Sequence, residues 1–94
     1  MIVERAIATR TLERYLDGTL ARRSDEGRGP LHAAYLLESI VGGHVSDEAK
    51  ANRWIGYAHA ILVECRWATL DELRAMTKAV IVEQTSSQPV ETIL

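Results

Sequence analysis

The sequence predicts an all-α fold: a small four-helix protein whose last two helices form an antiparallel helical hairpin. Three observations lead to this prediction. Apolar residues recur at three- and four-residue spacing in four segments, which is the pattern of amphipathic helices. Glycines, a proline and capping residues separate those segments. The only stretch that could compete as a strand is "AVIVEQT", where Val80, Ile81 and Val82 are β-branched.

The first half of the chain contains two of these helices. Apolar spacing predicts the first helix over residues 2–16, with Gly18 as a plausible stop. Segment 22–29, "RRSDEGRG", holds dense mixed charge and two glycines, so we expect a loop there. Pro30 suits a first helical turn, and the second helix is expected over residues 30–41, ended by a pair of glycines.

The third helix has the clearest apolar stripe. Ser46 is expected to be its N-cap, followed by two acidic residues that favour a helix N-terminus. The stripe covers about five turns and contains Ala51, Trp54, Ile55, Ala58, Ile61, Leu62 and Cys65.

The fourth helix begins at a capping box. Thr69 and Glu72 have the spacing at which each side chain satisfies the other residue's backbone amide. The helix is expected over residues 70–83, and its inner face is Leu70, Leu73, Met76, Val80 and Ile81. We expect a single helical domain over residues 1–84 and a loose C-terminal tail over residues 85–94.

Composition narrows the classes of function. The chain has 94 residues and a formal net charge of -2, so nucleic acid is an unlikely partner on charge alone. A chain this short is modestly stable, and we expect a homo-oligomer. Apolar runs such as residues 60–63 are far shorter than a membrane span. The single cysteine cannot form an internal disulfide, which fits a reducing cytoplasm.

No motif indicates catalysis. Cys65 lies on the apolar stripe near a helix C-terminus, where the dipole disfavours a thiolate, so it is expected to be buried and structural. His59 has no metal-ligating residue three or four positions away, and His32 and His44 are isolated. We therefore expect no enzyme, no cofactor and no metal site.

Two groups of residues are candidates for partner binding. Gly56 lies inside a helix, where glycine usually marks the close approach of another helix of the chain or of a second subunit. Arg53, Tyr57 and His59 border it on the sequence. Arg66 and Trp67 follow the third helix and have the residue types of binding hot spots. With Arg53 they form a candidate contact patch, although Trp67 could equally close the hairpin.

The segment "KANRWIGYAHAILV" followed by "TLDELR" resembles a pattern in small phage and prophage accessory proteins, an NRW(L/I)G(Y/F) helix leading to a TLDELR-like helix. The matching residues are Asn52, Arg53, Trp54, Gly56, Tyr57 and Thr69, Leu70, Asp71, Glu72, Leu73. Ala58, His59 and Ala60 depart from the glutamine and glycine found there. The resemblance implies a phage product that acts by binding in a bacterial cytoplasm, for instance as an anti-CRISPR inhibitor of host defence.

The leading hypothesis is a non-enzymatic, phage-encoded binding protein that inhibits a host protein. Two alternatives stay open. One is a small-molecule or cyclic-nucleotide sequestering protein, with a pocket between subunits around Trp54, Gly56, Tyr57 and His59. The other is a helix-turn-helix DNA-binding regulator, which Asp71 and Glu72 disfavour because they would face phosphate at the start of the recognition helix.

Overall fold

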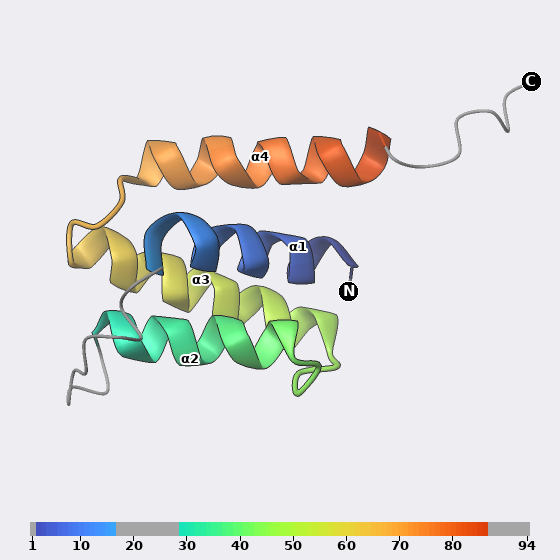
Figure 1. Cartoon of the computed structure of the whole chain (residues 1–94), viewed down its shortest axis with the longest axis horizontal. Coiled ribbons are helices and arrows are strands. Elements are labelled where there is room, and N and C mark those ends of the chain that lie inside the picture. Colours follow the sequence, from blue (N-terminus) through green and yellow to red (C-terminus); the bar gives the residue numbers. More distant parts are fainter. Residues whose placement is uncertain (1, 17–28, 87–94) are drawn as a thin grey trace, which may run out of the picture.

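The protein is all-helical throughout the part that the computed structural model describes, residues 2–16 and 29–86. Helix α1 (Ile2–Thr11) continues into a π-helical turn, η1 (Leu12–Leu16). Helices α2 (Pro30–Val41), α3 (Glu48–Glu64) and α4 (Leu70–Ser86) follow (Figure 1). The predicted helical class is confirmed, and "AVIVEQT" belongs to α4. The predictions for Gly18, for residues 22–28 and for residues 87–94 fall outside the described residues.

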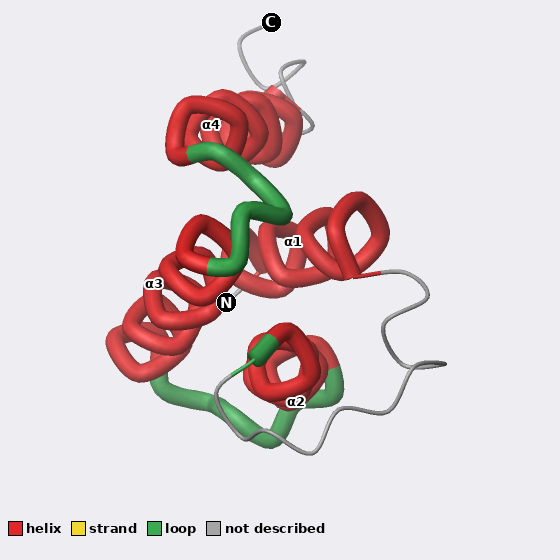
Figure 2. The backbone as a smooth tube through the Cα atoms, turned by 90° about the vertical axis from the view of Figure 1, so that its left-hand side faces the viewer, coloured by secondary structure: helices red, strands yellow, loops and turns green. Residues whose placement is uncertain are grey.

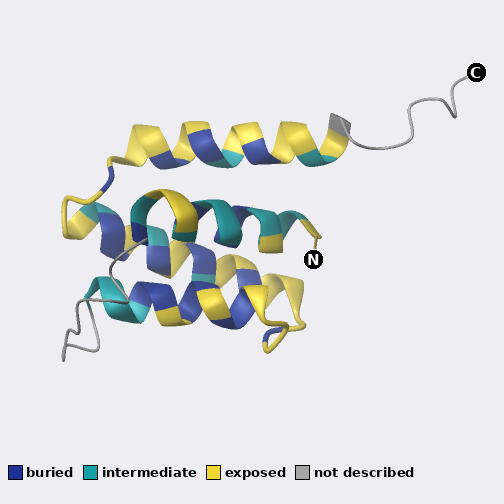
Figure 3. Ribbon diagram, viewed as in Figure 1, coloured by how far each residue is buried: buried dark blue, intermediate teal, exposed yellow. Residues whose placement is uncertain are grey.

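Consecutive helices run in opposite directions (Figure 1). They form a three-helix part and a single helix attached to one side of it. α1, α2 and α3 pack against one another, while α4 lies on the far side of α1 from α2 (Figure 2). The centre of the three-helix part is apolar, and Leu37, Ile40 and Leu62 are fully buried there (Figure 3). α1 therefore contacts all three other helices and connects α4 to the three-helix part.

The start of α3 differs from the prediction by one residue. Asp47, not Ser46, is the N-cap, and its carboxylate accepts a hydrogen bond of 3.1 Å from the Ala49 amide. The carboxylate satisfies an amide that has no helical partner and adds a negative charge at the positive end of the helix dipole. Ser46 lies outside the helix and is exposed.

The end of α3 corrects the prediction for Cys65, which is exposed rather than buried. Cys65 is the C-cap, so the apolar stripe of α3 ends one turn earlier at Ile61 and Leu62. Arg66 then adopts a left-handed conformation, with φ of 65°. The Trp67 amide donates to the Leu62 carbonyl at 2.9 Å and the Arg66 amide to the Val63 carbonyl at 3.0 Å. These two bonds form a Schellman motif, which turns the chain out of the helix.

The start of α4 is as predicted. The Thr69 hydroxyl accepts from the Glu72 amide at 3.1 Å, and the Glu72 carboxylate accepts from the Thr69 amide at 3.2 Å. The helix runs to Ser86, so Thr85 and Ser86, expected in a loose tail, are helical.

The path of α4 leaves the predicted close hairpin with α3 unconfirmed. α4 packs along α1 and not along α3 (Figure 2). Its Leu73, Met76 and Val80 are buried, each with 2% or less of its surface exposed. α3 and α4 therefore diverge, although only a short turn joins them.

Candidate functional site

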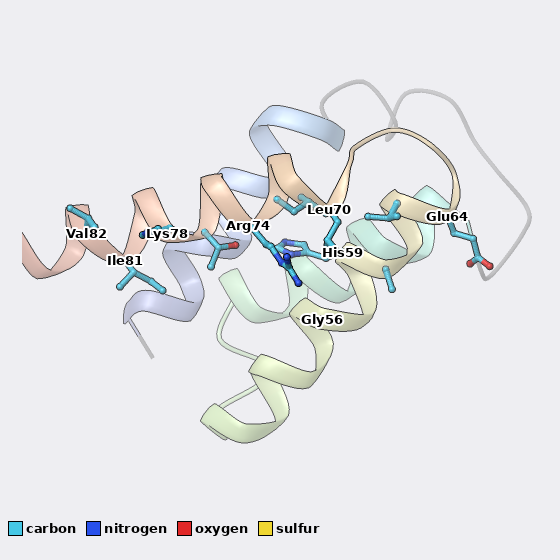
Figure 4. Close-up of a pocket in the computed structure, with 12 residues that line it drawn as sticks. Gly56, His59, Glu64, Leu70, Arg74, Lys78, Ile81 and Val82 are labelled. Carbon is cyan, nitrogen blue, oxygen red and sulfur yellow. The ribbon is translucent and has the colours of Figure 1, made fainter.

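A groove of ≈ 950 Å³ lies between α3 and α4, and its lining is mostly apolar (Figure 4). α3 contributes Gly56, His59, Ala60, Val63 and Glu64. α4 contributes side chains between Leu70 and Val82 along its length. The groove exists because α4 packs on α1, which leaves the facing sides of α3 and α4 without a partner helix.

The α3 side of the groove projects little because Gly56 and Ala60 have small side chains. A Cβ at Gly56 would meet no other atom within 4 Å, so no part of the described chain approaches this glycine closely. The sequence left open whether another helix of the chain or a second subunit approaches Gly56, and among the described residues no other helix does. Ala60, one turn later, is also exposed, and together they leave room for an incoming backbone.

His59 closes the floor of the groove through a bond to α1. Its Nε2 lies 3.0 Å from the Thr11 hydroxyl oxygen, and that hydroxyl donates its only proton to the Ile7 carbonyl at 2.7 Å. The Thr11 oxygen must therefore accept from His59, which places the proton of the neutral ring on Nε2. Burial lowers the pKa of His59 because it penalises the charged imidazolium. His59 is thus a neutral, partly buried residue that lines the groove.

The α4 wall presents large apolar side chains to solvent. Leu70 is 52% exposed, Ile81 44% and Val82 54%. They lie beside the face that Leu73 and Val80 bury against α1, so the apolar arc of α4 is wider than α1 covers. Leu70 and Ile81 were predicted on the inner face of α4, but both are exposed. The reason is that α4 has two apolar faces and α1 covers only one of them.

Charge in the groove is confined to few positions. Arg74 and Lys78 lie one turn apart on α4, both exposed, and neither forms an ion pair within residues 2–16 and 29–86. In Figure 4, Arg74 and His59 lie at the centre of the groove, while Glu64 lies at its far end and points away. The open part of the groove is therefore apolar with a basic α4 side.

An ion pair on the opposite side of α4 holds the helix to α1. The Arg10 guanidinium contacts both carboxylate oxygens of Glu83, at 2.7 and 3.5 Å. This hydrogen bond and the carboxylate charge raise the pKa of Arg10. Exposed pairs of this kind contribute little to stability because water screens them, so the buried apolar contacts remain the main attachment of α4.

Tyr57 belongs to a different surface, an aromatic cluster between α2 and α3. Its ring meets the edge of His32 with centroids 5.8 Å apart, and His32 stacks on Tyr35 at 6.1 Å. Tyr35 lies 6.4 Å from Trp54, and the Lys50 ammonium lies 5.0 Å above the Trp54 ring. Trp54, predicted on the apolar stripe of the third helix, is half-buried and packs against the core as well as in this cluster.

The remaining predicted residues are spread along α3 and its turn. Arg53 is exposed and lies about 16 Å along the helix axis from Glu64, so it does not share a patch with the turn. Trp67 is 37% exposed in the turn. Of the six predicted partner-binding residues, the groove brings together Gly56 and His59.

The described residues offer no other obvious chemistry. No group of three metal-binding side chains is found among them. Among their helices, none is long and apolar enough to cross a membrane. The Cys65 thiol is exposed, beside the C-terminal end of α3.

Comparison of the chain with protein-family models, with curated proteins and with solved structures finds no match. The functional argument therefore rests on the geometry of the groove.

Proposed function

We propose that the protein is a non-enzymatic binding protein whose α3–α4 groove receives an apolar segment of a partner protein. One observation carries this proposal. Leu70, Ile81 and Val82 remain 44% to 54% exposed along the groove, although neighbouring residues on the same helix are fully buried. Contiguous exposed apolar surface in a small protein typically marks an interaction site.

The shape of the groove favours a helix as the bound segment. The α4 wall extends from Leu70 to Val82, which is about 18 Å or more than three helical turns. A groove between two diverging helices is the geometry in which an amphipathic helix lays its apolar face against a receptor. Gly56 and Ala60 on the opposite wall would let the backbone of such a helix come close.

A small molecule is the second candidate, because a volume of ≈ 950 Å³ falls in the range of small-ligand sites. Such sites bury most of the ligand. Here the half-exposed Ile81 and Val82 form one wall, so a small ligand would stay in contact with water. The exposure of this wall favours a macromolecular partner.

DNA is a weaker candidate. The N-terminal turn of α4 presents Asp71 and Glu72, both exposed, and phosphate would be repelled there. Glu72 is also engaged in the capping box.

The resemblance of residues 50–78 to phage accessory proteins supports a narrower form of the proposal. In that form the partner is a host protein of a bacterial cytoplasm, and occupancy of the groove inhibits it, as an anti-CRISPR protein does. Binding without catalysis is sufficient for such a role.

Affinity capture from bacterial lysate with two matched variants tests the proposal. Ile81→Glu places a charge in the groove, and Val41→Glu makes the same change at a 39% exposed position on α2. We expect the wild type and Val41→Glu to retain the same protein, and Ile81→Glu to lose it while keeping its circular dichroism and melting temperature. Equal capture by both variants would contradict a role for the groove.

A further inference from the structure

We infer that the segment bound in the groove is an amphipathic helix with acidic side chains along one edge of its apolar face. This inference rests on the proposed function and adds the chemistry of the partner. It is carried by the distribution of charge over the two walls of the groove.

The α4 wall of the groove is basic. Arg74 and Lys78 are four residues apart on α4, so they lie on the same side of the helix. Like charges at this spacing disfavour a helix, and neither is neutralised by an ion pair within the described part of the chain. An acidic partner would remove that repulsion.

The α3 wall of the groove has no lysine or arginine to match those of α4. Gly56, Ala60 and Val63 carry no charge, and Glu64 lies at the end of the groove near the turn and points away from it (Figure 4). A helix seated in the groove would therefore meet cations on its α4 side only. Its apolar face would lie against Leu70, Ile81 and Ala60, and its acidic edge along Arg74 and Lys78.

The spacing of the cations specifies the acidic edge. Four residues of α4 rise about 6 Å, which is also the rise between positions i and i+4 of the bound helix. Two glutamates at that spacing can therefore each meet one cation when the two helices run nearly parallel or antiparallel. A single acidic residue would leave one cation unpaired.

The same charges argue against a second copy of this chain as the occupant. In a two-fold dimer the same patch serves both copies, so a second groove would offer Arg74 and Lys78 only the side chains of its own lining. Among the described residues, the one acidic side chain in that lining is Glu64, at the end of the groove. Charge complementarity thus favours a foreign acidic helix over self-association.

A peptide titration tests the inference on the full-length protein. The probes are two stapled helical peptides with the same leucine face, one with glutamates at i and i+4 along its edge and the other with lysines. Fluorescence anisotropy is measured with the wild type, with Arg74→Glu/Lys78→Glu, with Ile81→Glu, and with Arg5→Glu/Arg14→Glu. The last variant has the same net charge as the first double variant, and its substitutions are exposed and outside the groove lining.

We expect the wild type and Arg5→Glu/Arg14→Glu to bind the glutamate peptide at least about tenfold more tightly than the lysine peptide at low salt. Salt should reduce this preference, and Arg74→Glu/Lys78→Glu should reverse it. Ile81→Glu should weaken both peptides.

The contradicting outcomes are distinct. Equal wild-type affinity for both peptides, both lost in Ile81→Glu, would overturn the acidic edge and leave the groove as the binding site. No binding of either peptide would overturn the proposed function as well. A wild-type dimer in light scattering that Ile81→Glu makes monomeric would assign the groove to a second copy, and saturable binding of a fatty acid that excludes the peptides would assign it to a small amphiphile.

Discussion

His59 of α3 and Thr11 of α1 are joined by a hydrogen bond of 3.0 Å beneath the α3–α4 groove. Because the Thr11 hydroxyl donates to the Ile7 carbonyl, the bond places the neutral histidine proton on Nε2. His59, which lines the groove, thus also joins α3 to α1.

Stability should fall in mild acid because of His59. Burial lowers its pKa below the ordinary 6.5, so the unfolded chain takes up this proton more readily than the folded one. The contribution is fully present above pH 6.5 and is lost as the pH falls from there through the lowered folded pKa. Urea unfolding at a series of pH values measures it. His59→Gln should show a flatter pH dependence than the wild type, and an unchanged slope would show that His59 is not the group responsible.

Gly56→Ala should raise the free energy of unfolding by about 1 kcal/mol, because alanine favours a helix over glycine and the site has open space. Gly43→Ala is the matched control. Gly43 has φ of +83°, so alanine there should destabilise by about 1 kcal/mol. Thermal or urea unfolding distinguishes the two. Destabilisation by Gly56→Ala would mean that something in the isolated protein already packs against this glycine.

Arg66→Gly should also raise stability by about 1 kcal/mol, since Arg66 holds the left-handed position of the Schellman motif and glycine adopts it without strain. Arg66→Ala removes the same charge and keeps the backbone strain, so its stability should stay close to the wild type. Comparing the two in denaturant separates the backbone from the side chain. If both variants gain equally, the charge and not φ limits the wild type.

Much of the fold was predictable because local rules agree with the packing. The Thr69 and Glu72 capping box, the glycine pair after α2 and the stripe at Ile55, Ala58 and Ile61 each follow from short-range chemistry. Errors arose where neighbouring residues compete for a role. Ser46 and Asp47 are both good caps, and Cys65 continues the stripe in sequence but falls on the residue that ends the helix.

The site was less predictable because it depends on which helix α4 packs against. Apolar spacing placed Leu70 and Ile81 on the inner face of α4, and the last two helices were predicted to form a hairpin. α4 packs on α1 instead, and only Leu73, Met76 and Val80 are buried there. One signal was available: the apolar residues of α4 span an arc too wide for one neighbouring helix. Gly56 was found from sequence because a helical glycine is costly.

Photo-crosslinking in bacterial cells tests the central claim, that the α3–α4 groove binds a partner protein, most directly. Benzoylphenylalanine replaces Val82 in the groove wall or, as a control, Val41 on α2; their exposures are 54% and 39%. The account predicts a discrete adduct with another protein from position 82 and none from position 41. No adduct from position 82, or one with the mass of two copies of this chain, would contradict it.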